Sequence, residues 1–347
     1  MHDEMKNLLF LLAAMALLLP GCGRKTAAEG DSPLPVIFET DLGNDVDDAL
    51  ALDLLYKYQD AGKIRLLAVN LNKNGEAPAE FADIMNTWYG YPDIPIGIIR
   101  DGAECENDAA VNYAKAVVEL KDAEGKPLFA RSHPGYADYP EAVTLYRKLL
   151  AAEPDHSVVI ASVGFSTNLI RLLETDADGY SPLNGKELVA KKVKLLVTMA
   201  GCINNPKTHE YNVKKDIPAA KVIFEEWPTP VVTSPFEVGV QIRYPAASIE
   251  KDFAWAPQHP AVEAYKAYLP MPYDRPTWDP TAVLYAVEGG DWFTVSAPGR
   301  IEVTEEGSTL FTEDSAGTRR YLAVTTEQAG TILQHFIGMI TSIPRNR

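Results

Sequence analysis

The chain has 347 residues, with 48 acidic against 32 basic side chains and a formal net charge of −16. Hydrophobic residues make up 46% of it and charged residues 23%, a globular composition that excludes a disordered or fibrous protein. The negative charge would repel nucleic acid and anionic lipid surfaces, so neither is expected as a partner. Three cysteines and six histidines are too few for a disulfide framework or a histidine-rich metal centre, whereas the abundant carboxylates suit a hard, oxygen-bound cation.

An apolar run of twelve residues, 8–19, follows Lys6 and ends shortly before Gly21 and Cys22. As a helix it would span about 18 Å, less than the about 30 Å of a bilayer core, which favours a secretory signal over a membrane span. A small residue followed by cysteine resembles the processing site of bacterial lipoproteins. That resemblance implies a signal peptide over residues 1–21, lipidation of Cys22 and an exported protein anchored to a bacterial membrane on its periplasmic or surface face. The alternative is an ordinary cleaved signal with an incidental cysteine.

Residues 22–33 are rich in small and charged side chains and predict a flexible tether. From residue 34 on, short apolar runs alternate with longer amphipathic ones. The predicted strands are 35–39, 64–71, 94–99, 157–163, 193–200 and 230–234, and the predicted helices are 47–58, 79–89, 107–120, 139–152, 167–174 and 217–227. Strands that are apolar on both faces and separated by helices indicate a parallel sheet covered on each side.

After about Ser234 this alternation gives way to Pro- and Trp-rich segments, with a β-hairpin predicted near residues 300–324. No linker separates this part from the rest, so it is interpreted as a C-terminal helical and β-hairpin extension. The fold class predicted is α/β: a single Rossmann-like domain over residues 34–345, with a mostly parallel central sheet and helices on both faces.

Polar residues cluster where the predicted strands end. They are Asp41, Asp45, Asp47 and Asp48 after the first strand, Asn70, Asn72 and Asn74 at the second, Ser162 and Gly164 at the fourth, Asn204, Asn205, Glu210 and Asn212 after the fifth, and Glu237 after the sixth. In open α/β sheets, ligands bind outside the carboxyl ends of the strands. The pattern therefore predicts one acidic, amide-rich pocket with carboxylates for a cation, amides for hydroxyl groups and few cationic groups for a phosphate.

Four aspartates, Asp41, Asp45, Asp47 and Asp48, lie within eight residues at a strand-to-helix turn. Aspartates at a helix start often serve as caps, which accounts for one or two of them. Four together would repel one another unless a cation neutralises them, so a metal site is predicted. The spacing does not fit an EF-hand, and a haloacid-dehalogenase-type phosphatase would need its nucleophilic aspartate where Glu39 stands.

The segment 38–52 resembles the Asp-rich N-terminal signature of the inosine-uridine-preferring nucleoside hydrolase family. Four later segments resemble motifs of that family in the same order: 159–168 with its Gly-x-x-Thr-Asn turn, 199–201, 210–220 and 279–283. The resemblance covers roughly residues 35–287. It implies a calcium-dependent hydrolase of the N-glycosidic bond of nucleosides, which releases ribose and a free base.

By this resemblance, Ca²⁺ would be held by the carboxylates of Asp41, Asp48 and Asp279 and by the backbone carbonyl of Val163. Asp41 would also take a proton from the attacking water, and Asp47 would hold ribose hydroxyl groups. The further substrate-binding residues implied are Asn74 (or Asn72), Asn204, Asn205, Glu210, Asn212 and Trp278.

Two departures from the family pattern matter. The loop between Asp41 and Asp47 is two residues longer than usual, so Asp45 is an alternative to Asp48 as the second carboxylate ligand. Trp278 stands where many members have a histidine that helps the base to depart. A tryptophan can stack on the base instead, which predicts a preference for purine nucleosides.

Two other residues near the predicted pocket have plainer interpretations. Cys202 has no obvious histidine partner and is expected to be a small buried residue. His209 precedes Glu210 and is a candidate to line the pocket, although a position in a loop or behind the pocket is favoured. Two competing functions stay open: a lipid-anchored nucleoside- or sugar-binding protein with impaired catalysis, and a hydrolase of another furanoside. In each case the partner is a small-molecule nucleoside or related riboside, and a homo-oligomer is left open.

Overall fold

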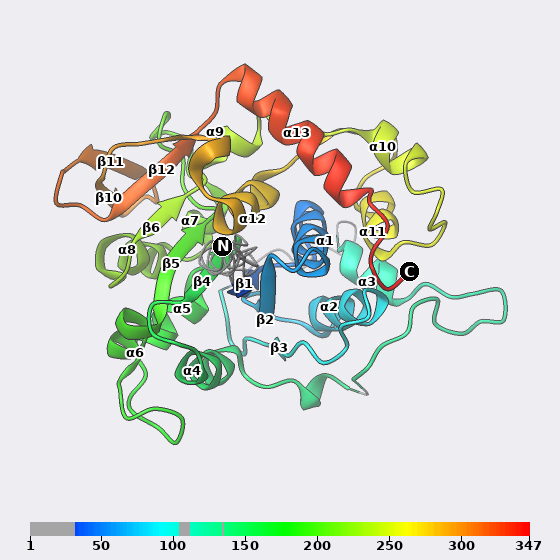
Figure 1. Ribbon diagram of the computed structural model, residues 1–347, viewed down its shortest axis with the longest axis horizontal. Coiled ribbons are helices and arrows are strands. Elements are labelled where there is room, and N and C mark those ends of the chain that lie inside the picture. The colour runs from blue at the N-terminus through cyan, green and yellow to red at the C-terminus, as the bar shows by residue number, and fades with distance from the viewer. Residues whose placement is uncertain (1–31, 104–111, 134) are drawn as a thin grey trace, which may run out of the picture. The chain divides into compact units, whose positions relative to one another are not determined.

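The apolar runs after residue 33 form the strands of a ten-stranded mixed sheet in a computed structural model that describes residues 32–103, 112–133 and 135–347 (Figure 1). Residues Pro33–Arg347 form one compact unit. The strands of this sheet are β1 (Leu34–Thr40), β2 (Ile64–Leu71), β3 (Ile96–Gly97), β4 (Val158–Ser162), β5 (Val193–Thr198), β6 (Val231–Thr233), β9 (Thr294–Val295), β10 (Gly299–Val303), β11 (Thr309–Glu313) and β12 (Arg319–Ala323). The predicted signal peptide, Cys22, nearly all of the predicted tether and residues 107–111 of a predicted helix lie outside the described residues.

The central strands follow the order β3-β2-β1-β4-β5-β6 and are all parallel. This is the strand order of a Rossmann fold, so the predicted fold class is confirmed. β12 continues the sheet parallel to β6, while β9, β10 and β11 add antiparallel pairings. The predicted C-terminal hairpin is thus β10–β11, and β12 joins it to the main sheet.

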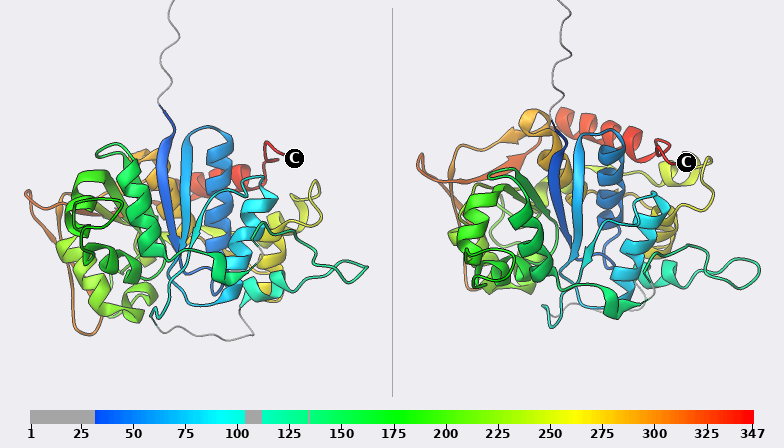
Figure 2. Two further views of the ribbon diagram at one scale, coloured as in Figure 1. Left: turned by 90° about the horizontal axis from the view of Figure 1, so that it is seen from below. Right: turned by 60° about the horizontal axis from the view of Figure 1, so that its bottom comes forward.

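Helices cover both faces of the sheet (Figure 2). Val36 and Phe38 of β1 lie in one core cluster, and Ile37 between them lies in the other, as expected for a strand buried on both faces. The first cluster contains residues of α1 (Asp47–Asp60), α2 (Glu76–Trp88), α3 (Tyr113–Val118), α11 (Pro260–Tyr268), α12 (Trp278–Glu288) and α13 (Thr326–Ile340). The second contains residues of α4 (Ala142–Ala152), α5 (Thr167–Leu173), α6 (Gly185–Lys192) and α8 (Ile217–Glu226).

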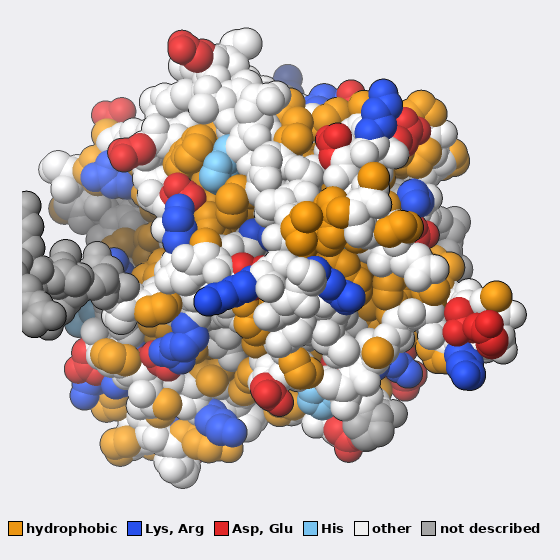
Figure 3. Space-filling model, turned by 45° about the vertical axis from the view of Figure 1, so that its right-hand side comes forward, with side chains coloured by type: hydrophobic (Ala, Val, Ile, Leu, Met, Phe, Trp, Pro, Cys, Tyr) orange, Lys and Arg blue, Asp and Glu red, His pale blue; other side chains and the backbone are white. Residues whose placement is uncertain are grey.

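Short elements complete the unit. They are the helices α7 (Tyr211–Lys215), α9 (Phe236–Gly239) and α10 (Ala246–Lys251), the 3₁₀ turns η1 (Tyr136–Asp138) and η2 (Gly290–Trp292), and a separate two-stranded antiparallel sheet of β7 (Arg243–Tyr244) and β8 (Arg275–Pro276). No helix among the described residues is long and apolar enough to cross a bilayer. On the face seen in Figure 3, acidic and basic side chains are interspersed.

Prolines explain where two helices depart from their predicted bounds. α4 begins at Ala142 and not at Tyr139, because Pro140 keeps the residue before it in an extended conformation. α2 begins three residues early, because Pro78 lies in its first turn, where a missing N–H costs no helical hydrogen bond.

The end of the chain returns to α1 after α13. Lys57 of α1 donates to the carbonyl of Ser342, and Asp60 accepts from the backbone N–H of Arg345 at 2.9 Å. Asn346 donates to the carbonyl of Tyr89, just after α2, at 3.0 Å. The C-terminal residues therefore hold the end of α1 that lies far from the aspartates.

Candidate active site

The strand order places a crevice between the carboxyl ends of β1 and β4. The two strands are neighbours and parallel, but α1 follows β1 onto one face of the sheet and α5 follows β4 onto the other. A ligand site is expected at such a switch point. A cavity of about 470 Å³ lies there, and Asp41 and Val163, the residues just beyond the ends of β1 and β4, both line it.

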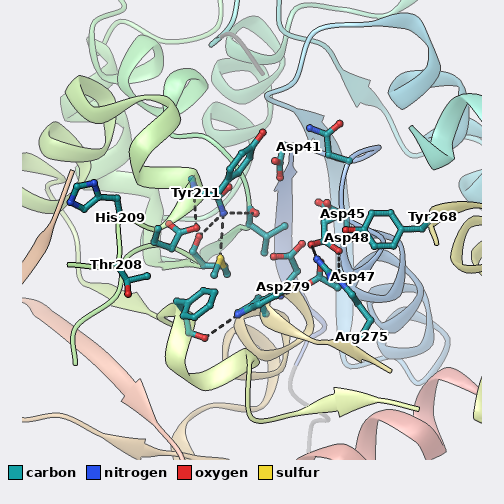
Figure 4. A pocket seen from close by; sticks show the side chains of 17 residues that line it. Asp41, Asp45, Asp47, Asp48, Thr208, His209, Tyr211, Tyr268, Arg275 and Asp279 are labelled. Carbon is teal, nitrogen blue, oxygen red and sulfur yellow. Dashed lines mark hydrogen bonds and ion pairs between the residues drawn. The ribbon is translucent and has the colours of Figure 1, made fainter. Parts of the chain in front are cut away.

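Carboxylates from three elements meet in this cavity (Figure 4). Asp41 follows β1, Asp47 and Asp48 form the first turn of α1, and Asp279 lies in the first turn of α12. All four are buried. The structure therefore places the residues named as calcium ligands around one cavity, although they are up to 238 positions apart in the chain, from Asp41 to Asp279.

Asp41 is buried and has charged neighbours. Burial raises its pKa to about 7 against the opposing positive charge of Lys73, and the charges of Asp45 and Glu210 add to the increase. Gly164, at the end of β4, is packed so closely that a Cβ atom on it would lie 2.7 Å from Oδ1 of Asp41. Glycine is therefore required at this position by the close approach of Asp41.

Asp47 and Asp48 are held by hydrogen bonds from different elements. Asp47 accepts from the backbone N–H of Asp279 at 3.0 Å, which ties the start of α1 to the start of α12. Thr40, the last residue of β1, donates its hydroxyl to Asp48. Burial raises the pKa of Asp48 well above its ordinary value, and repulsion from Asp41 and Asp47 raises it further. Burial, followed by repulsion from Asp45, raises the pKa of Asp47, and burial, followed by repulsion from Asp47 and Asp48, raises that of Asp279.

Asp45, the alternative to Asp48, has a different partner. Its carboxylate forms a two-point ion pair with the guanidinium of Arg275 in β8, with Nε and Oδ1 2.9 Å apart. Its side chain is 31% exposed, whereas Asp48 is 2% exposed. Because Asp45 is already neutralised by Arg275, this arrangement favours Asp48 as the carboxylate that faces a cation.

Glu210 and Asn212 line the cavity but also organise its backbone. Glu210 caps α7, because its carboxylate accepts from the N–H groups of Asn212 and Val213, and it accepts from that of Gly201 at 2.9 Å. The Asn212 amide donates to the carbonyls of Val163 at 3.1 Å and Met199 at 3.0 Å. These contacts fix the ends of β4 and β5, and with them the direction of the Val163 carbonyl.

The other predicted asparagines do not line the cavity. Asn74 is bound to the backbone N–H of Gly102, and Asn205 donates to Thr208 in its own loop. Asn204 is exposed, and its backbone N–H donates to Glu237. Asn72 is fully buried and accepts from the N–H of Phe165, beside the position where a Gly164 side chain would be.

Several lining residues were not singled out from the sequence as part of the site. They are Asn44, Met199, Thr208, Tyr211, Phe236, Tyr268 and Arg275. His209 also lines the cavity, which is the less favoured of its two predicted positions, while Cys202 is buried as expected. Thr208, His209 and Tyr211 lie on one side of the carboxylates, and Tyr268 and Arg275 lie on the other (Figure 4). Arg275 follows Tyr268 by seven residues in the sequence. No local pattern around either residue predicts that Arg275 pairs with Asp45.

The family model described as inosine-uridine preferring nucleoside hydrolase matches residues 36–332. The chain belongs to this family. It is therefore a glycosidase that acts on N-glycosyl compounds. A search of curated proteins finds no match.

Solved structures show the same nucleoside hydrolase fold at low sequence identity. A purine-preferring ribonucleoside hydrolase from Gardnerella vaginalis has a TM-score of 0.68 and 18% identity, covering 88% of this chain and 98% of that one. A plant nucleoside hydrolase has a TM-score of 0.66 and 19% identity, covering 88% and 99%. An inosine-uridine preferring nucleoside hydrolase from Bacillus anthracis has a TM-score of 0.62 and 17% identity, covering 88% and 99%.

The metal donors expected from the sequence are all oxygens: the carboxylates of Asp41, Asp48 and Asp279 and the backbone carbonyl of Val163. Within the described ranges, no group of three or more His, Cys, Asp and Glu side chains is arranged closely enough to hold an ion as it stands. Asp41, Asp48 and Asp279 all line the cavity, but Asp48 accepts a hydrogen bond from the Thr40 hydroxyl. Carboxylates whose pKa values are raised by burial and by repulsion from neighbouring carboxylates are stabilised in their charged form by a cation, and an oxygen-only donor set is that of a hard cation.

Proposed function

We propose that this chain hydrolyses the N-glycosidic bond of nucleosides in a calcium-dependent reaction that gives ribose and a free base. The observation that carries the proposal is the convergence of Asp41, Asp48, Asp279 and the Val163 carbonyl on one cavity at the switch point of the sheet. Asp41, Asp48, Asp279 and the Val163 carbonyl would hold the ion. When bound, Ca²⁺ would lower the pKa of the attacking water and help to orient the ribose hydroxyl groups.

The protein's own groups supply the rest of the chemistry. Asp41 would accept a proton from the attacking water, because its carboxylate lines the cavity between the end of β1 and the other carboxylates. Positive charge builds on the sugar as the bond to the base breaks, and the surrounding carboxylates stabilise it. Asp47, whose backbone contact with Asp279 fixes its direction, is placed to hold ribose hydroxyl groups.

The aromatic side of the cavity supports a preference for purine bases. Phe236 and Trp278 stack with their ring centroids 5.5 Å apart, and Tyr268 lies beyond them on the same cavity. A two-ring base covers more of such a surface than a one-ring base, and stacking contributes about 1–3 kcal/mol per base. We therefore expect inosine, adenosine and guanosine to be cleaved faster than uridine and cytidine.

The test is release of reducing sugar from single nucleosides with calcium present. The wild-type protein should release ribose, and Asp41→Asn should release it more slowly by about 10³-fold or more, because it removes the base while keeping the shape. A wild-type protein that binds nucleosides but returns them intact would instead be a binding protein. Cleavage of other furanosides but not of nucleosides would assign it a different glycoside substrate.

A further inference from the structure

The Arg275 guanidinium is a fixed cation at a cavity otherwise dominated by carboxylates. Its Nε and Nη2 atoms donate to Asp45, and it lies 5.0 Å from the ring centroid of Tyr268 and 5.1 Å from that of Trp278. No hydrogen bond from Nη1 is found among residues that the structure describes, and the side chain is 21% exposed. Arg275, which lines the cavity, therefore has hydrogen-bonding capacity left for a ligand.

Trp278 cannot supply that capacity. Its only N–H donates to the backbone carbonyl of Phe236 at 2.9 Å, so the indole has no donor left for a ligand. The departing base, however, takes the electron pair of the broken bond and needs a donor to stabilise its charge. An arginine stays charged at any ordinary pH and donates strong hydrogen bonds to anionic oxygen and nitrogen atoms.

The position of Arg275 fits the base and not the far end of the sugar. Glu210 and Asn212, the expected sugar contacts, belong to the side of the cavity that carries Tyr211. Arg275 lies on the opposite side with Asp45 and Tyr268 (Figure 4), where it donates to Asp45. A base attached to a ribose held by Asp47 would lie within reach of the Arg275 side chain.

We propose that Arg275, oriented by Asp45, is the catalytic residue that stabilises the departing base. This inference rests on the proposed nucleoside hydrolysis. The bond between C1′ and the base nitrogen breaks, and its electron pair goes to the base, which accepts a hydrogen bond from Arg275. The water oxygen forms the new bond to C1′, its proton goes to Asp41, and the base takes a proton from solvent. Asp45 is a positioning residue, because it touches Arg275 and not the reacting atoms.

The experiment compares inosine with 4-nitrophenyl riboside, whose leaving group needs no help, in the full-length protein with saturating calcium. Arg275→Ala should lower kcat/KM for inosine by about 100- to 1000-fold, mostly in kcat, and change that for the nitrophenyl riboside by less than about threefold. Added guanidinium chloride should restore part of the inosine turnover. Arg275→Lys keeps the positive charge, so its kcat/KM for inosine should lie between those of the wild type and Arg275→Ala. Arg243→Ala is the matched control, because Arg243 lies on the paired strand β7 and is exposed.

The outcomes separate this inference from the proposed function. Equal losses on both substrates in Arg275→Ala and Arg275→Lys, or no loss on either, would overturn the role of Arg275. So would a substrate-selective loss in His209→Ala with none in the Arg275 variants, since His209 is another donor at the cavity. A wild-type protein that cleaves only the nitrophenyl riboside would also overturn it. Failure of the wild type on both substrates would overturn the proposed hydrolysis itself.

Discussion

Gly164 and Asp41 approach each other so closely that no side chain fits between them. A Cβ atom on Gly164 would lie 2.6 Å from the backbone nitrogen of Asp41 and 2.7 Å from its Oδ1 atom. Because Gly164 directly follows the Val163 carbonyl, this contact sets the spacing between two of the expected calcium ligands.

Gly164→Ala should therefore disturb the site more than the fold. We expect a loss of about 1–3 kcal/mol in the free energy of unfolding, typical of overpacking, together with a much larger fall in calcium affinity and ribose release. Gly179→Ala is the control, since nothing lies within 4 Å of a Cβ at that position. Calorimetry and a sugar assay would measure the effects. Unchanged calcium binding in Gly164→Ala would show that the contact does not set the ligand spacing.

Asp48 and Asp45 are expected to respond differently when each is neutralised. Asp48→Asn should weaken calcium binding by at least about 100-fold, because it removes a buried charge beside Asp41, whereas Asp45→Asn should change it by less than about threefold. Isothermal titration with calcium measures both. The opposite order would identify Asp45 as the ligand and would require its ion pair with Arg275 to open.

Glu39 gives the metal-free protein a specific dependence on pH. It is fully buried next to the hydroxyl of Tyr146, and burial raises its pKa from 4.5 to about 8 although Tyr146 and Asn168 oppose the rise. Between these two values the folded state keeps the proton that the unfolded state loses. The unfolded state thus binds fewer protons, and the contribution of Glu39 to stability falls as pH rises from 4.5 to about 8.

The measurement is Tm against pH in the presence of a chelator for the wild type and for Glu39→Gln. The wild-type Tm should fall relative to that of the variant across this window, because glutamine carries no titrating proton. A difference in Tm that stays constant with pH would mean that Glu39 titrates normally.

The N-terminal segment predicts a lipid anchor at Cys22, and one substitution tests it. Cys22→Ser should leave an unprocessed precursor or a soluble exported form, because the cysteine sulfur is the atom that would carry the lipid. Detergent-phase partitioning and mass spectrometry of the mature N-terminus report the result. A Cys22→Ser protein that still enters the detergent phase would contradict lipidation at this residue.

The sequence was sufficient to predict the positions of the central strands and most of the carboxylates that line the cavity. The runs that became β1, β2, β4 and β5 are apolar on both faces, which is a local signal, and Asp41, Asp47 and Asp48 follow the first of them directly. Asp279 was found only through its resemblance to a family motif. Strand order was not readable in advance, because it depends on pairings such as that of β1 with β4, which are more than a hundred residues apart.

The amide residues were harder to predict for a physical reason. Asn74, Asn204 and Asn205 follow strands just as Asn212 does, but the local backbone decides where each side chain points. Asn212 follows a helix cap, which directs its amide back to the ends of β4 and β5, whereas Asn205 bonds within its own loop. The pairing of Asp45 with Arg275 joins residues 230 positions apart, and the local sequence around neither residue predicts the other as its partner.

The contacts between α1 and the last residues of the chain make the C-terminus a poor place for a fusion. α1 has 14 residues and so acts as a rigid rod of about 21 Å, with Asp47 and Asp48 at one end and Lys57 and Asp60 near the other. Ser342 and Arg345 hold that far end, and Asn346 is bound beside it. An affinity tag that displaces these residues would remove the contacts that hold the C-terminal end of α1 and would let the helix change its orientation. Asp47 and Asp48 at its N-terminal end would then shift. A loss of activity in a C-terminally tagged protein would therefore come from movement of α1 and not from direct damage to the cavity.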